Sequence, residues 1–146
     1  MITPYGHLTY CSNIHPGEKW ADHFQALRDN LPFIRQQLAP GQPFGLGLRV
    51  ANEASIELSK PEVIGAFKQW LSENDIYVFV INGFPYGGFH NTVVKDNVHT
   101  PDWTTGDRLA YTKRLFNILA ELLPADMHGG VSTPPLSYRL WWKTES

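Results

Sequence analysis

Four polar side chains stand where short apolar segments of the sequence end, and their types suit the binding of a small polar molecule. They are Asn13, Arg49, Asn82 and Ser132. If the segments are parallel strands, their carboxyl ends meet at one edge of a sheet, where α/β proteins bind ligands. Asparagine and serine exchange hydrogen bonds with hydroxyl or carbonyl groups, and the planar guanidinium of arginine suits a carboxylate or phosphate. These residues are predicted to bind a small-molecule metabolite.

Two of these residues also have structural interpretations, which the sequence leaves open. Arg49 is suited to an ion pair with an acidic residue such as Glu53, and the Asn82 side chain is suited to capping a turn. Either role would use the same polar atoms as ligand binding. The choice therefore depends on what surrounds the two side chains in the fold.

Two histidines, His15 and His90, follow the first and third apolar segments. A neutral imidazole in such a place binds a metal or moves a proton near pH 7. We expect His90 to be the catalytic group and His15 to contact the substrate, although a lone histidine is more often a hydrogen-bonded loop residue. No pair among the six histidines has the close, regular spacing of a zinc motif.

The segment 76–81, IYVFVI, is apolar throughout, which predicts a central strand buried on both faces. A loop of about 20 residues follows it, far longer than the usual connection, and its many aromatic residues argue against disorder. We expect Phe84 and Tyr86 to stack on a sugar-like or aromatic ligand, with Phe89 and Trp103 beside them. The alternative is that these rings only fold the loop onto the rim of the sheet.

Hydrophobic periodicity predicts the order β-α-β-α-β-α-β. The expected strands cover 6–11, 44–50, 76–81 and 129–133, and the expected helices run from about 18 to 38, from a cap at Ser59 to Asn74, and from about 107 to 123. Pro32 predicts a kink or a break in the first helix near Leu31. The stripe of the last helix predicts that Leu109 faces inward with four later apolar residues.

Two architectures fit this order: an open doubly wound sheet, or the amino-terminal half of an eight-stranded (β/α)8 TIM barrel with four parallel strands and about three helices. Gly45 and Gly47 alternate with large apolar residues in the second strand. Mid-strand glycines indicate close approach by other atoms, as in a crowded barrel interior or at a bound ligand. This alternation favours the barrel. A full barrel needs about 250 residues, so a single incomplete TIM-barrel domain is expected over residues 1–146.

Composition excludes several classes of function. The net charge is −2 and basic residues form no runs, which argues against nucleic acid and anionic membranes as partners. No apolar segment approaches the ~20 residues of a membrane-spanning helix, and the start of the chain lacks the pattern of a signal peptide. A single cysteine, Cys11, is compatible with a reducing compartment. We therefore expect a cytoplasmic protein that is not inserted in a membrane.

Four segments resemble a known family. LTYCSNIHPGEKW (8–20), PFGLGLRV (43–50), YVFVINGFPYGGFHNTVVKDNVHTPDW (77–103) and GGVSTPPLSYR (129–139) are similar to the amino-terminal part of the bacterial metabolite traffic protein EboE family. The resemblance implies a xylose isomerase-like TIM barrel that handles or exports a small metabolite. It also implies a divalent metal in the full-length family member, with most ligands supplied by later strands and with His90 close to the metal.

Two functions remain open at this point. One is metal-assisted isomerisation of a small polar metabolite, for which this chain would supply only part of the site and would be inactive alone. The other is a non-catalytic binding or carrier protein that supports metabolite export, which the lack of a carboxylate pair at the strand ends favours. Trp141 and Trp142 would leave apolar surface exposed, so they are expected either to pack against further sequence of a longer protein or to meet a partner chain, such as a second copy in a homodimer through an open barrel edge.

Overall fold

The protein was analysed as a computed structural model that describes residues 1–88 and 95–142. Its centre is a sheet of four strands, all parallel, in the order β3-β4-β5-β6. The strands are β3 (Tyr10–Cys11), β4 (Phe44–Arg49), β5 (Ile76–Asn82) and β6 (Gly130–Ser132). The chain thus adds each strand next to the previous one, without the reversal of order that defines a doubly wound sheet. The predicted parallel α/β fold is confirmed.

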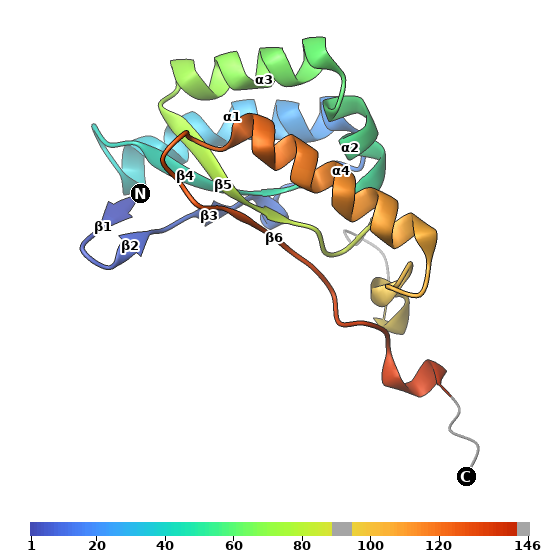
Figure 1. Cartoon of the computed structure of the whole chain (residues 1–146). Helices are drawn as coiled ribbons and strands as arrows, with labels where there is room; N and C mark the ends of the chain where they lie inside the picture. The colour runs from blue at the N-terminus through green and yellow to red at the C-terminus, as the bar shows by residue number, and fades with distance from the viewer. Residues whose placement is uncertain (89–94, 143–146) are drawn as a thin grey trace.

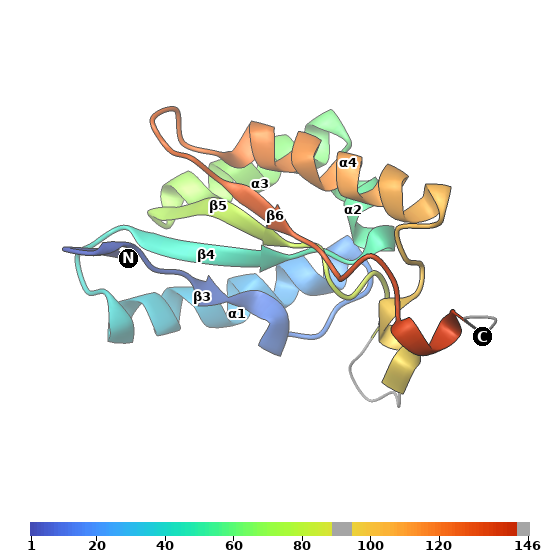
Figure 2. The same cartoon turned by 60° about the horizontal axis from the view of Figure 1, so that its bottom comes forward.

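Four helices cover one face of the sheet, as Figure 1 and Figure 2 show from two directions. They are α1 (Trp20–Leu38), α2 (Asn52–Leu58), α3 (Pro61–Glu73) and α4 (Gly106–Leu122), and short 3-10 turns cover Ser12–Ile14, Lys95–His99 and Arg139–Trp141. The core lies between the sheet and these helices. Its fully buried members include Leu46 and Leu48 from β4 and Leu115 from α4.

The other face of the sheet carries no helix within the described ranges. On β5 this face bears Tyr77, Val80 and Asn82, which are only half buried, whereas Val78 and Ile81 on the helix face have no exposed surface. The expectation of a strand buried on both faces is therefore wrong for β5. The described helices bury one face of the sheet only, although most parallel sheets are covered on both faces.

The start of the chain differs from the single strand predicted over 6–11. Residues Ile2–Thr3 (β1) and Gly6–His7 (β2) form an antiparallel hairpin, and only Tyr10–Cys11 joins the main sheet. The connecting segment crosses close to β4. A Cβ atom built on Gly45 would lie 2.3 Å from the carbonyl oxygen of Leu8, and one on Gly47 would lie 3.0 Å from Oγ1 of Thr9. The chain itself, rather than a ligand, explains these two glycines.

Three helix predictions need correction. Helix α2 was missed because seven residues show too little periodicity, and Ser59 follows α2, donating from Oγ to the carbonyl oxygen of Ser55, instead of capping α3. Helix α1 continues through Pro32 without a break, because Leu27 and Leu31 hold it against the core. Leu109, which was predicted to face inward, is 52% exposed.

The described helices include none that is both long enough and apolar enough to span a membrane.

Candidate functional site

Three of the four residues predicted to line one rim lie side by side at the carboxyl ends of their strands. Arg49 pairs with Asn82 across β4 and β5, and Asn82 pairs with Ser132 across β5 and β6. In-register residues of neighbouring strands share a face, and this row lies on the face without helices. Ser132 Oγ donates to Asn82 Oδ1 over 2.9 Å, so the structure joins two of the side chains directly.

Asn82 has the capping role that the sequence left open. Its Oδ1 accepts a hydrogen bond from the backbone N–H of Phe84 over 3.1 Å, which makes it the cap of the turn that follows β5. Because a backbone N–H only donates, this contact also fixes which end of the amide is oxygen. The amide nitrogen then points elsewhere, and nothing in the described part of the chain accepts its hydrogens. Asn82 therefore caps the turn and still offers two donors.

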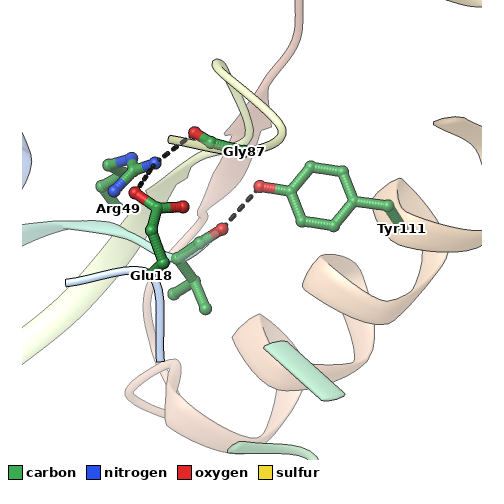
Figure 3. A network of polar contacts seen from close by, with 5 residues as sticks. Glu18, Arg49, Gly87 and Tyr111 are labelled. Atoms are coloured by element: carbon green, nitrogen blue, oxygen red, sulfur yellow. Dashed lines mark hydrogen bonds and ion pairs between the residues drawn. The ribbon is translucent and has the colours of Figure 1, made fainter. Parts of the chain in front are cut away.

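Arg49 is 1% exposed, and its backbone and its guanidinium both make polar contacts (Figure 3). Its backbone N–H donates to Ser12 Oγ over 2.8 Å. Its Nη2 donates to the carbonyl oxygen of Gly87 over 2.7 Å and lies 3.4 Å from Oε1 of Glu18. The predicted ion pair exists, but the acid is Glu18, which precedes α1, and not Glu53. Sequence spacing favoured the near acid, whereas the fold brings the distant one to the rim.

The prediction for Asn13 was displaced by one residue. Strand β3 ends at Cys11, and Asn13 lies inside the 3-10 turn Ser12–Ile14. It is the fully buried Ser12 whose hydroxyl meets the backbone of Arg49 at the strand end. The short strand explains the error, because the expected strand phase assumed regular alternation up to the turn.

A second buried arginine, Arg108, was not anticipated. Its Nε donates to the carbonyl oxygen of Pro101 over 2.7 Å and its Nη1 donates to that of Gly83 over 2.8 Å. The guanidinium lies 5.5 Å from the ring centres of both Tyr86 and Tyr111, and burial lowers its pKa. The buried stripe of α4 runs through Arg108 and Tyr111 instead of Leu109. A stripe that includes a charged residue cannot be found from apolar periodicity.

The two buried arginines hold the start of the long loop in place. Arg108 binds the carbonyl oxygen of Gly83 and Arg49 that of Gly87, while the backbone N–H of Asn52 donates to the carbonyl oxygen of Tyr86 over 2.8 Å. Residues 83–88 are therefore fixed at three points. A rigid loop at the strand ends costs little entropy when a ligand binds.

The aromatic residues of the loop differ in what they contact. The ring of Tyr86 packs edge-on against Tyr111 at 4.9 Å and is partly buried against the core. Tyr111 in turn donates to the carbonyl oxygen of Val50 over 2.5 Å (Figure 3). Phe84 stacks on His99 at 5.6 Å and is half buried. Trp103 Nε1 donates to Thr133 Oγ1 over 3.1 Å, and Phe89 lies outside the described residues.

His15 is buried and its Nε2 lies 3.1 Å from the hydroxyl of Tyr10. Burial lowers the pKa of His15 below its ordinary value of 6.5, so the neutral imidazole is favoured. His90, the expected catalytic group, lies outside the described residues. Within residues 1–88 and 95–142, no three side chains of His, Cys, Asp or Glu gather where they could hold a metal ion. These ranges alone therefore do not fit a divalent metal centre.

The depressed pKa of His15 predicts a pH dependence of stability. A histidine that titrates lower in the folded chain binds its proton more readily when unfolded, so the free energy of unfolding falls as the pH drops below about 6.5. We expect His15→Gln to show a smaller fall than the parent between about pH 7.5 and about pH 5.5. Urea unfolding at both pH values measures this. Equal slopes in the two proteins would contradict the assignment to His15.

One cavity lies away from the strand ends. It has a volume of about 580 Å³ and lies between α3 and α4, with Ile64, Lys68, Ile118 and Glu121 among its walls. An ion pair of 3.1 Å joins Lys68 and Glu121. None of the residues of the strand-end row lines it, so we do not assign the cavity to the candidate site.

The fold and the row Arg49, Asn82 and Ser132 define a class: an α/β chain with a four-stranded parallel sheet and a polar rim at its carboxyl edge. Comparisons of the sequence and structure with known protein families, with curated proteins and with solved structures found no match. The class is therefore drawn from the geometry of the chain itself.

Proposed function

We propose that the chain is the amino-terminal half of a xylose isomerase-like (β/α)8 barrel of the EboE type. The support is the sequential strand order β3-β4-β5-β6, with the four described helices on one face of the sheet. A barrel is built in this order with glycine and polar residues turned inward, and Gly47, Arg49 and Asn82 share the face without helices. The motif resemblance and the single cysteine extend this proposal to a cytoplasmic protein in metabolite traffic.

The function that this geometry supports best is the binding of a small polar metabolite that carries a carboxylate or phosphate. The observation that carries the proposal is the amide of Asn82, whose oxygen is held by Phe84 and Ser132 while its nitrogen offers two donors on the uncovered face. The adjacent guanidinium of Arg49 adds positive charge. A donor and a cation side by side at the strand ends suit an anionic oxygen group.

Glu18 indicates where the anion would bind. Its carboxylate is 40% exposed and lies 3.4 Å from Arg49 Nη2, a longer contact than the 2.7 Å between that nitrogen and Gly87. Glu18 is the exposed member of this pair, whereas the Arg49 side chain has no exposed surface. A carboxylate or phosphate of a ligand would therefore reach the guanidinium by taking the place of Glu18.

Binding without catalysis is the form of the proposal that needs only the described residues. Metal-assisted isomerisation, with a divalent cation and with His90 as the acid-base group, would need ligands from outside them. If such a metal is bound in a longer protein, it would polarise oxygens of the substrate. The chain's own part would remain the orientation of the ligand by Asn82, Ser132 and Arg49.

The test is a titration with anionic and neutral probes. We expect inorganic phosphate, citrate and a pentose 5-phosphate to bind more tightly than the neutral pentose. Asn82→Ala should weaken anion binding by about tenfold, because one buried hydrogen bond is lost. Glu18→Gln should strengthen it, since the competing carboxylate is removed. Isothermal titration calorimetry measures both effects.

The control for these variants is Asn30→Ala, which changes an exposed asparagine on α1 and should leave binding unchanged. Equal affinity for the phosphorylated and the neutral pentose would sink the anion proposal. Unchanged affinity in both the Asn82 and the Glu18 variants would show that any binding occurs elsewhere.

A further inference from the structure

We infer that two copies of the chain associate through their open sheet edges, so that β6 of each copy pairs in parallel with β3 of the other in a closed ring of eight strands. The inference rests on the barrel part of the proposed function. It names the partner that would complete the wall of the same site.

Both edges of the sheet are open within the described residues. Strand β3 pairs only with β4, and β6 pairs only with β5. An open edge presents unpaired backbone N–H and C=O groups, and closure into a barrel removes both edges at once. A two-fold axis along the barrel axis keeps all strands parallel and brings β6 of one copy to β3 of the other. Four strands from each copy give the eight of a standard barrel.

The face of the sheet without helices is covered in part by the β1–β2 hairpin, whose His7 contacts the rings of Tyr77 and Phe79. Tyr77, Phe79 and Val80 are half buried on β5, and the rings of Tyr77 and Phe79 stack at 6.0 Å. Parallel sheets are almost always covered on both faces. In the closed ring the part of this face that the hairpin leaves exposed would be turned toward the same part of the partner copy. The polar rows at the two rims would then face one another across one mouth.

Most exposed large apolar side chains of the described residues lie on segments that adjoin the two edge strands in sequence or flank them in space, and none lies on β3 or β6 themselves. Figure 2 shows α1 beside β3 and α4 beside β6. Around the first edge the exposed residues are Ile2, Tyr5, Leu8, Ile14, Phe33 and Leu38. Around the second edge they are Leu109, Phe116, Leu136, Leu140, Trp141 and Trp142. Among the exposed large apolar residues that the structure describes, Ile56 alone lies on α2. Exposed apolar surface concentrated in this way marks interaction sites.

A second copy is the occupant that these observations favour. Each chain carries both apolar edges, so a two-fold arrangement packs the β6 edge of each copy against the β3 edge of the other and leaves neither edge exposed. A different partner would have to match both edges separately. The net charge of −2 also keeps the repulsion between two copies small.

The experiment measures the mass in solution by sedimentation equilibrium. We expect twice the chain mass of 16.6 kDa. Ile14→Asp at the first edge and Leu140→Asp at the second should each weaken association by at least about tenfold, because a charge is buried in an apolar contact. Ile56→Asp is the matched control and should leave the dimer intact. All three side chains are more than half exposed, so folding, checked by circular dichroism, should survive.

A second readout uses Cys11, which is exposed on β3. Its reaction with a thiol reagent should slow as the protein concentration rises, since pairing with the partner's β6 covers that edge. A monomer at the highest soluble concentration, an assembly larger than two copies, or a dimer that both edge variants leave unchanged would overturn the inference. A monomer that still binds phosphate would refute the dimer alone, whereas a dimer that binds no anion would refute the proposed function alone.

Discussion

The Arg108→Ala variant is expected to lose about 3 to 5 kcal/mol of its free energy of unfolding. The carbonyl oxygens of Pro101 and Gly83 would each lose a hydrogen bond from a charged donor, and each such bond contributes about 1.5 to 3 kcal/mol. The side chain has no exposed surface, so its removal also leaves a cavity beside Tyr86 and Tyr111. The loop start at Gly83 would lose one of its three anchors.

Urea unfolding followed by tryptophan fluorescence measures this loss. Lys113→Ala is the matched control, because Lys113 lies on the same helix with its side chain exposed, and its stability should change by less than about 0.5 kcal/mol. Arg108→Lys separates charge from shape: lysine keeps the charge but not the planar fork, and it should still be clearly destabilised. If the Arg108→Ala protein were as stable as the Lys113→Ala control, Arg108 would not anchor the loop.

The strands and the polar row were predictable because local sequence determines them. The apolar runs of β4 and β5 end at Arg49 and Asn82, and alternation assigns Arg49 to the face of Gly45 and Gly47. Strict alternation from Tyr77, which pairs with Gly45, would place Asn82 on the other face; the register shift between Leu46 and Gly47 moves it to the face of Arg49. Parallel pairing then brings them side by side, as the register shows. Ser132 follows by the same rule at the end of β6.

The partners of these residues were not predictable, because they come from distant parts of the chain. Glu18 is 31 positions from Arg49, and Gly87 meets Arg49 through a backbone oxygen that carries no sequence signal. Ser12 binds the backbone of Arg49 for the same kind of reason. Whether Arg49 serves a ligand or the fold was therefore open from sequence, and the structure shows that it already supports the loop.

The Gly45→Ala variant is expected to lose about 3 kcal/mol of its free energy of unfolding. The added methyl group would lie 2.3 Å from the carbonyl oxygen of Leu8 and 2.9 Å from the backbone nitrogen of Met1, and backbone atoms cannot move aside as a flexible side chain can. The segment would have to lift away from β4. That movement would strain the hydrogen bonds between Leu8 and Met1 and the pairing of Tyr10 with Leu46.

The same substitution at Gly65 should raise the free energy of unfolding instead of lowering it. Gly65 lies inside α3 with nothing within 4 Å of the added atom, so alanine should stabilise the protein by about 0.5 to 1 kcal/mol through helix propensity. Urea unfolding of the two variants side by side tests the pair. A stable Gly45→Ala protein would mean that residues 8 and 9 do not cross β4 closely. The attachment of β3 to the sheet, on which the first open edge depends, would then have to be revised.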